Sequence, residues 1–118
     1  MTFSLDGNTI TIEQGSTFSL SVNYKDSAGS TIDLSSYTAR MQCRLGRAAT
    51  STVFSLTSGS GITLAASDPN VLVTIPATTT AGYDAPLRGV YDLEIESPAG
   101  VVTKLLKGTL LVEAEVTR

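Results

Sequence analysis

Apolar and polar residues alternate with a period of two along most of the chain. Over residues 16–25, every second side chain from Phe18 to Tyr24 is apolar, and the side chains between them are hydroxyls or amides. The same alternation returns over 37–45 and 88–97. This pattern is typical of a strand with one face in a core and one face in water. No segment has the 3.6-residue repeat of an amphipathic helix.

Short apolar runs rich in β-branched residues predict further strands between these segments. Clusters of Gly, Pro, Asp, Asn and Ser separate the runs and predict turns. The irregular segment 76–87 is expected to cross between two sheets, with one helical turn at 78–83. Gly108 is expected at a bulge or bend. The expected strands cover 16–25, 37–45, 53–57, 62–65, 71–75, 88–97 and 101–107, with a short return strand at 31–32 and a continuation beyond Gly108 to Val116.

Seven or eight short strands joined by regular turns predict an all-β fold. We expect a single domain, residues 1–118, that forms a two-sheet immunoglobulin-like β-sandwich of seven to eight antiparallel strands. A small barrel is the alternative architecture. The inward positions of the strands define the expected core, which consists of Phe18, Leu20, Val22, Met41, Cys43, Phe54, Leu56, Val73, Ile75, Tyr91, Leu93, Ile95, Leu106, Leu110 and Val112.

The composition narrows the classes of partner. The chain has 118 residues and a formal net charge of -3. It lacks the positive surplus that a phosphate backbone attracts, so no nucleic acid is expected as a partner. Its apolar runs fall far short of the roughly 20 residues of a membrane span, and its first residues, MTFSLDGN, do not resemble a signal peptide. The 14 Ser and 17 Thr against 3 Lys indicate a hydroxyl-rich surface of low charge.

The sequence offers no obvious catalytic set. It has no His to activate a Ser or Thr hydroxyl, and no Ser-x-x-Lys spacing is present. We therefore expect neither an enzyme nor a cofactor. The single cysteine, Cys43, excludes an internal disulfide bond and falls on the inward face of its strand, where it is expected to act as a small inert apolar residue.

Three acidic side chains, Asp92, Glu94 and Glu96, share one face of an expected strand. Such a row could bind Ca²⁺, which prefers oxygen ligands. Pairing with basic side chains across neighbouring strands is the favoured interpretation. The basic residues available for this pairing are Arg40, Arg44, Lys104 and Lys107.

Two features predict partner contacts. The basic cluster around Arg40 and Arg44 either pairs with acids of its own sheet or contacts an acidic partner. Both ends of the chain contain apolar residues, and such ends can add a strand to a neighbour, although pairing inside their own sheet is the favoured alternative. The candidate contact residues are therefore Phe3, Leu5, Arg40, Arg44, Leu111, Glu113, Glu115 and Arg118.

Four blocks of the sequence carry a resemblance to a known group of proteins. They are TIEQGSTF at 11–18, DLSSYTARMQCR at 33–44, YDLEIESPAG at 91–100 and LLKG at 105–108. Together they resemble the small β-sandwich proteins encoded among the virion genes of tailed bacteriophages. More distantly, they are similar to the N-terminal domain of phage baseplate upper proteins, which anchors receptor-binding parts to the baseplate. The resemblance spans nearly the whole chain and transfers no functional residue.

The resemblance implies a non-enzymatic structural protein of the virion, made in the cytoplasm of the bacterial host. It would dock onto other virion proteins at the tail, the baseplate or the fibre attachment region. Phage symmetry implies a homo-oligomer in three-fold or six-fold copies. The alternative is a capsid decoration, or cement, protein. A carbohydrate-binding module is a third and weaker hypothesis, because the chain has no Trp and only Tyr83 falls in a loop where it could stack on a sugar.

Overall fold

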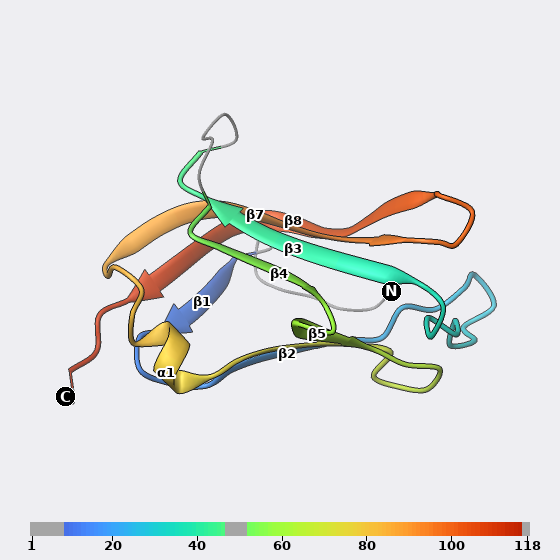
Figure 1. Ribbon diagram of the computed structural model, residues 1–118, viewed down its shortest axis with the longest axis horizontal. Helices are drawn as coiled ribbons and strands as arrows, with labels where there is room; N and C mark the ends of the chain where they lie inside the picture. The colour runs from blue at the N-terminus through green and yellow to red at the C-terminus, as the bar shows by residue number, and fades with distance from the viewer. Residues whose placement is uncertain (1–8, 47–51, 117–118) are drawn as a thin grey trace.

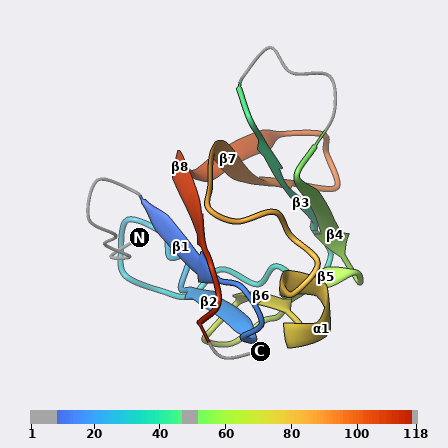
Figure 2. The ribbon, with the colours of Figure 1, turned by 90° about the vertical axis from the view of Figure 1, so that its left-hand side faces the viewer.

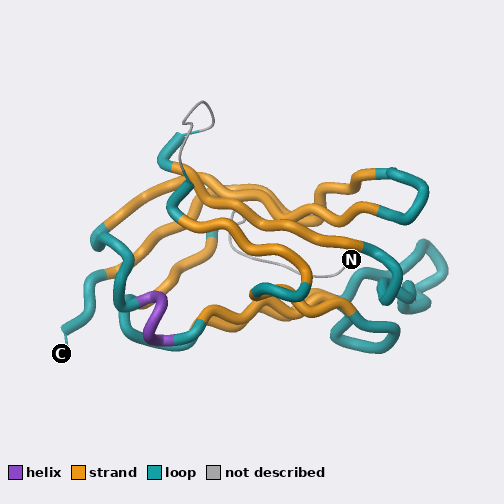
Figure 3. Tube along the Cα trace, in the orientation of Figure 1, coloured by secondary structure: helices purple, strands orange, loops and turns teal. Residues whose placement is uncertain are grey.

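Eight strands and one helical turn form the described part of the chain in a computed structural model, which describes residues 9–46 and 52–116 (Figure 1). Loops and turns lie mainly at the two ends of the strands (Figure 3). The elements are β1 (Ile10–Glu13), β2 (Phe18–Val22), β3 (Thr38–Arg44), β4 (Phe54–Ser58), β5 (Gly61–Leu64), β6 (Val71–Ile75), α1 (Ala77–Thr80), β7 (Leu87–Glu96) and β8 (Val102–Glu113).

The strands hydrogen-bond in the order β1-β8-β7-β3-β4-β5-β6-β2. This ladder folds over on itself, so that β1, β8, β7, β3 and β4 form a large layer and β5, β6 and β2 a small layer (Figures 1 and 2). The neighbours β3-β7-β8 and β2-β6-β5 match strands C-F-G and B-E-D of the immunoglobulin arrangement. The expected immunoglobulin-like β-sandwich of eight strands is therefore confirmed.

The expectation that all strands are antiparallel is wrong in two places. Ile10 to Glu13 of β1 pair in parallel with Leu110 to Glu113 of β8. Strands β4 and β5 are also parallel over a short ladder at a tight turn. Both exceptions lie next to a point where the chain moves from the large layer to the small one, from β1 to β2 and from β4 to β5. In the described part of the chain the sheet is mixed.

Most strands begin and end close to their expected limits, but β1 was not expected. Its four residues, Ile10 to Glu13, give only two apolar positions, which is too short a run to show a period. The expected return strand at 31–32 is reduced to an isolated bridge between Lys25 and Thr31. The helical turn expected within 78–83 is confirmed as α1, and it lies in the crossover from the small layer to the large one.

A β-bulge in β8 lies at Leu105 and not at Gly108 as expected. Leu93 of β7 pairs with Leu106, whereas the next residue, Glu94, pairs with Lys104. Leu105 is the extra residue, and because of it both Leu105 and Leu106 are buried. Two adjacent side chains can point into the core only if the alternation of the strand is interrupted between them. The bulge therefore sets which residues of β8 point outward after it.

The core lies between the two layers. All but two of the expected core residues are buried, and the exceptions, Phe18 and Leu56, are partly buried and pack against the others. Two buried polar side chains, Asn70 and Thr80, have all their hydrogen-bonding atoms paired. The buried apolar residues that the sequence pattern did not place in the core are Ile10, Ile12, Leu34, Ala39, Ile62, Val71 and Leu105.

Candidate docking surface

The two outer faces of the sandwich differ in charge. The strands of the small layer carry no charged side chain, and their outward residues include Ser19, Ser21, Thr63 and Thr74. The outward positions of β3, β7 and β8 are rich in charge, and we call this surface the charged face. Its charged residues are Arg40, Arg44, Arg88, Asp92, Glu94, Glu96, Lys104, Lys107 and Glu113.

Glu94 is the centre of an ion-pair network on the charged face. Its carboxylate accepts hydrogen bonds from Arg40 on β3 and from Lys104 on β8, with the Lys104 Nζ at 2.6 Å. Lys104 also contacts Asp92 at 3.0 Å, and Arg40 contacts Glu96 at 3.3 Å. These pairs link three adjacent strands, because Arg40, Glu94 and Lys104 are direct neighbours in the two ladders.

The network shifts the protonation of its members. Hydrogen bonds from Lys104, and then from Arg40, lower the pKa of the Glu94 carboxyl below its ordinary value of 4.5. The hydrogen bond to Glu94 in turn raises the pKa of Lys104. The side chain of Glu94 is only 13% exposed, so its charge is held between two cations rather than in open water. The charges of this part of the face are therefore paired with one another, which holds the side chains in one arrangement.

A groove of about 340 Å³ lies next to this network. Arg44 donates from Nη2 to Gln42 Oε1 at 3.0 Å on one side of it, and Lys107 lies on the other. Lys107 is the ladder neighbour of Asp92, yet the Asp92 carboxylate is paired with Lys104. Among the described residues, Lys107 has no ion pair within 4.0 Å. The groove is lined by Gln42, Arg44, Val90, Tyr91, Asp92, Lys107 and Gly108.

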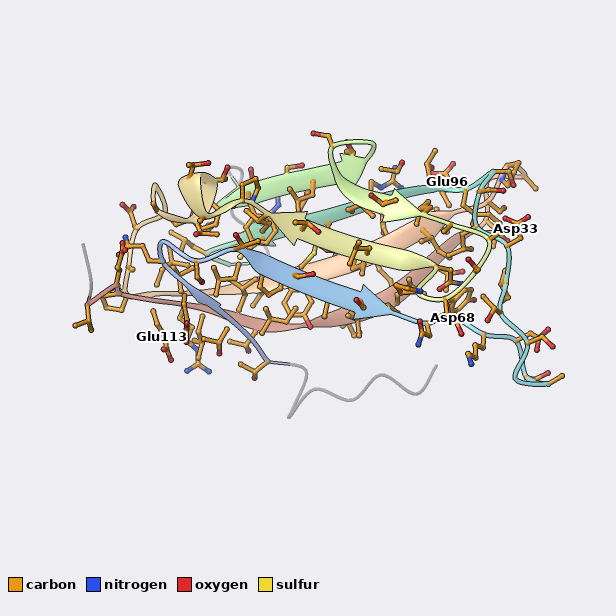
Figure 4. The ribbon with its side chains drawn as sticks, turned by 90° about the horizontal axis from the view of Figure 1, so that it is seen from below. Asp33, Asp68, Glu96 and Glu113 are labelled. Carbon is orange, nitrogen blue, oxygen red and sulfur yellow. The ribbon has the colours of Figure 1, made fainter. Side chains whose placement is uncertain are left out.

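Acidic residues gather at one end of β1 and β8. Glu13 and Glu113 are direct neighbours in the parallel ladder, and both are exposed. The carboxylate of Glu115 lies close to Gly15, which has φ +83 and where an added Cβ would collide with it. Figure 4 places Glu113 at the opposite end of the molecule from Asp33, Asp68 and Glu96. Like charges side by side in a ladder destabilise it slightly unless a cation is brought near.

The basic residues were expected either to pair with acids of their own sheet or to contact an acidic partner, and the structure shows which of them are paired. Arg40 is paired with Glu94 and Glu96, so the prediction of cross-strand pairing is confirmed for it. The same prediction is confirmed for Lys104, whereas no ion pair joins Lys107 to the acidic row within the described ranges. Lys104 forms ion pairs with Asp92 and Glu94. The acidic row of β7 is therefore paired with basic side chains of the neighbouring strands.

Strand addition at the end of β8 is contradicted. Leu111 pairs with Arg88 on one side and with Thr11 on the other, so its backbone has no open edge. The preferred alternative, pairing inside the same sheet, is confirmed for this strand. The side chains of Leu111 and Glu113 nevertheless point outward on the charged face.

The remaining candidate contact residues do not join this surface. The Glu115 amide donates to Gln14 Oε1 at 3.1 Å, which fixes the segment that follows β8. Phe3, Leu5 and Arg118 lie outside the described residues.

Sequence reasoning missed Val90 and Gln42 as members of a surface groove. Both follow from the period of two, because they alternate with the buried Tyr91 and Cys43. Lys107 follows from the same alternation, because it comes directly after the inward Leu106. The outward direction of Lys104 instead depends on the bulge at Leu105, which the local pattern does not reveal.

Three other features bear on function. Burial raises the pKa of the Cys43 thiol to about 11, which disfavours the reactive thiolate at neutral pH. The ring of Tyr83 stacks on Phe54 with centroids 6.0 Å apart, which occupies one of its faces. Over residues 9–46 and 52–116, no group of three or more His, Cys, Asp or Glu side chains is arranged to hold a metal ion, and no helix is long and apolar enough to cross a membrane.

Comparisons with known proteins add nothing on the function of the chain. Neither a protein-family model nor a curated protein sequence matches the chain. Among solved structures, the chain is similar to one titled as a structure of murine CRIg, with 11% sequence identity over 92% of each chain and a TM-score of 0.44. A likeness at this level carries no argument about fold, ligands or partners.

Proposed function

We propose that this chain is a non-enzymatic structural protein of a tailed-bacteriophage virion, which docks onto other virion proteins at the tail, baseplate or fibre attachment region. The charged face is the observation that carries the docking role. It combines a pre-paired network centred on Glu94 with an adjacent groove between Arg44 and Lys107. The sequence blocks that resemble virion β-sandwich proteins support the virion as the location.

Two properties of the charged face favour protein binding, its pre-formed ion pairs and the apolar surface beside them. Arg40, Glu94 and Lys104 already hold one another, so little side-chain freedom is left to lose when a partner covers them. Beside them, Val90 and Leu111 offer partly buried apolar surface at outward positions. Interfaces commonly combine such an apolar patch with a polar rim. In the proposed assembly the chain occurs in three-fold or six-fold copies, as the symmetry of the particle requires.

The first test is the protein content of purified particles. Mass spectrometry should detect this chain in phage particles after density-gradient purification, and its absence would refute the virion role. Quantitative densitometry then decides the location. A copy number that matches the tail symmetry supports tail docking, whereas one that matches the capsid lattice identifies a capsid decoration protein.

The second test addresses the surface. Arg44→Glu reverses a charge beside the groove, and Lys25→Glu makes the same change in net charge at a surface ion pair away from it. We expect Arg44→Glu to lower the number of copies per particle, and Lys25→Glu to leave it unchanged. Equal incorporation of both variants would show that docking does not use the charged face.

A further inference from the structure

We infer that the charged face is self-complementary and binds a second copy of this chain through an antiparallel, two-fold contact along β8. After the bulge at Leu105, the outward side chains of β8 are Lys107, Thr109, Leu111 and Glu113. Lys107 and Glu113 are exposed and carry opposite charges, and the two residues between them are partly buried. A cation, two uncharged side chains and an anion thus follow one another on one face.

The positions of these four side chains along β8 are symmetric about Leu110. Lys107 and Glu113 lie equally far from Leu110 on either side, as do Thr109 and Leu111. A two-fold axis that crosses the strands at Leu110 therefore places Lys107 of one copy opposite Glu113 of the other, and the reverse pair forms by symmetry. Such a closed contact uses the same patch on both copies.

The charges that face one another in this contact are those that the single chain leaves without partners. Within the described part of the chain, neither Lys107 nor Glu113 has an ion pair within 4.0 Å, whereas Lys104 holds both Asp92 and Glu94. Glu113 also stands beside Glu13 in the β1–β8 ladder. A lysine supplied by a second copy would bring a positive charge beside these two ladder neighbours of like charge.

Strand β7, the neighbour of β8, adds a further pair of facing residues to the proposed contact. Val90 is the ladder neighbour of Thr109, and Arg88 that of Leu111. The same axis therefore places Val90 against Arg88 of the second copy, where the aliphatic part of the arginine can cover the valine. The outer face of the small layer has no charged residue and offers no such complementarity.

Charge exchange in the full chain tests this contact by sedimentation velocity over a range of protein and salt concentrations. The wild-type protein should form a reversible dimer that weakens as salt rises. Lys107→Glu should raise the dissociation constant by at least about tenfold, because it sets two glutamates against each other at both symmetric positions. The double variant Lys107→Glu/Glu113→Lys should restore the dimer, since both pairs are then re-formed with their signs exchanged.

The control is Lys25→Glu, which changes the net charge by the same amount and should dimerise like the wild type. Circular dichroism of each variant establishes that it is folded. A wild-type chain that stays monomeric at every concentration overturns the inference, as does a trimer or a larger ring. Failure of the double variant to recover the dimer also overturns it. The inference does not rest on the virion role, because it concerns the pure protein and the virion role is tested on purified particles. The second copy and a docked virion protein would cover the same residues, Val90 and Leu111, so each chain binds one of the two at a time.

Discussion

The side chain of Asn70 pairs with the backbone of Tyr24 through both of its polar atoms. Its Oδ1 accepts from the Tyr24 amide at 2.8 Å, and its Nδ2 donates to the Tyr24 carbonyl at 2.8 Å. The same Nδ2 donates to the carbonyl of Ile32 at 2.9 Å. Asn70 is fully buried and thereby ties the long connection between β2 and β3 to the start of β6.

Asn70→Ala should lower the free energy of unfolding by about 2–4 kcal/mol, because it removes three hydrogen bonds and takes from the Tyr24 amide and the Ile32 carbonyl the partner that Asn70 supplies. Chemical denaturation monitored by circular dichroism measures the change. Asn23→Ala, next to Tyr24 at an exposed position for which no hydrogen bond is found in the described part of the chain, is the control and should cost less than about 1 kcal/mol. Equal effects of the two changes would contradict the bridging role of Asn70.

Leu93→Asp should abolish cooperative folding. Leu93 is fully buried at the centre of β7, and an unpaired carboxylate there would cost more than a small domain can supply. Thr74→Asp places the same residue at an exposed position of β6 and should leave the protein folded. A thermal melt of both variants provides the measurement. A folded Leu93→Asp protein would show that the inward face of β7 is assigned wrongly.

The stability contributed by Glu94 should depend on pH. The folded state lowers the pKa of its carboxyl below the ordinary value of 4.5, so the unfolded chain takes up the proton first as the pH falls. The contribution is therefore complete above pH 4.5 and is lost as the pH drops through the lower pKa of the folded state. The difference in unfolding free energy between the wild type and Glu94→Gln should shrink over that range. A difference that is constant with pH would contradict the network around Glu94.

Gly89→Ala should destabilise the contact between β7 and β3. A Cβ at Gly89 would lie 2.7 Å from the Arg44 carbonyl oxygen, a backbone atom that cannot move aside cheaply. We expect a loss of about 1–3 kcal/mol, as for other overpacked core positions. In Gly82→Ala the new Cβ meets its nearest neighbour, the Thr79 carbonyl oxygen, at 3.5 Å, which is an ordinary contact. This control should unfold at nearly the wild-type temperature, and a similar loss in both variants would disprove the close approach at Gly89.

The alternation of apolar and polar residues determined much of this protein by itself. It predicted the all-β class, the approximate limits of β3 and β7, and the inward direction of residues such as Met41 and Leu93. These features are local, because in a strand each side chain points to the side opposite its neighbour. The same alternation placed Asp92, Glu94 and Glu96 on one outward face and allowed their pairing with basic residues to be predicted.

Only the tertiary structure decided which segments lie side by side. Ile10 pairs with Leu110, and no pattern within either segment indicates that partner. The bulge at Leu105 depends on the fit of β8 against β7, and because of it Lys104 and Lys107 point outward on the same face although they lie three residues apart. From its place opposite Glu94, Lys104 contacts both Glu94 and Asp92. Strand pairing joins residues far apart in the chain, so its register follows from the packing of the whole core and not from the local sequence.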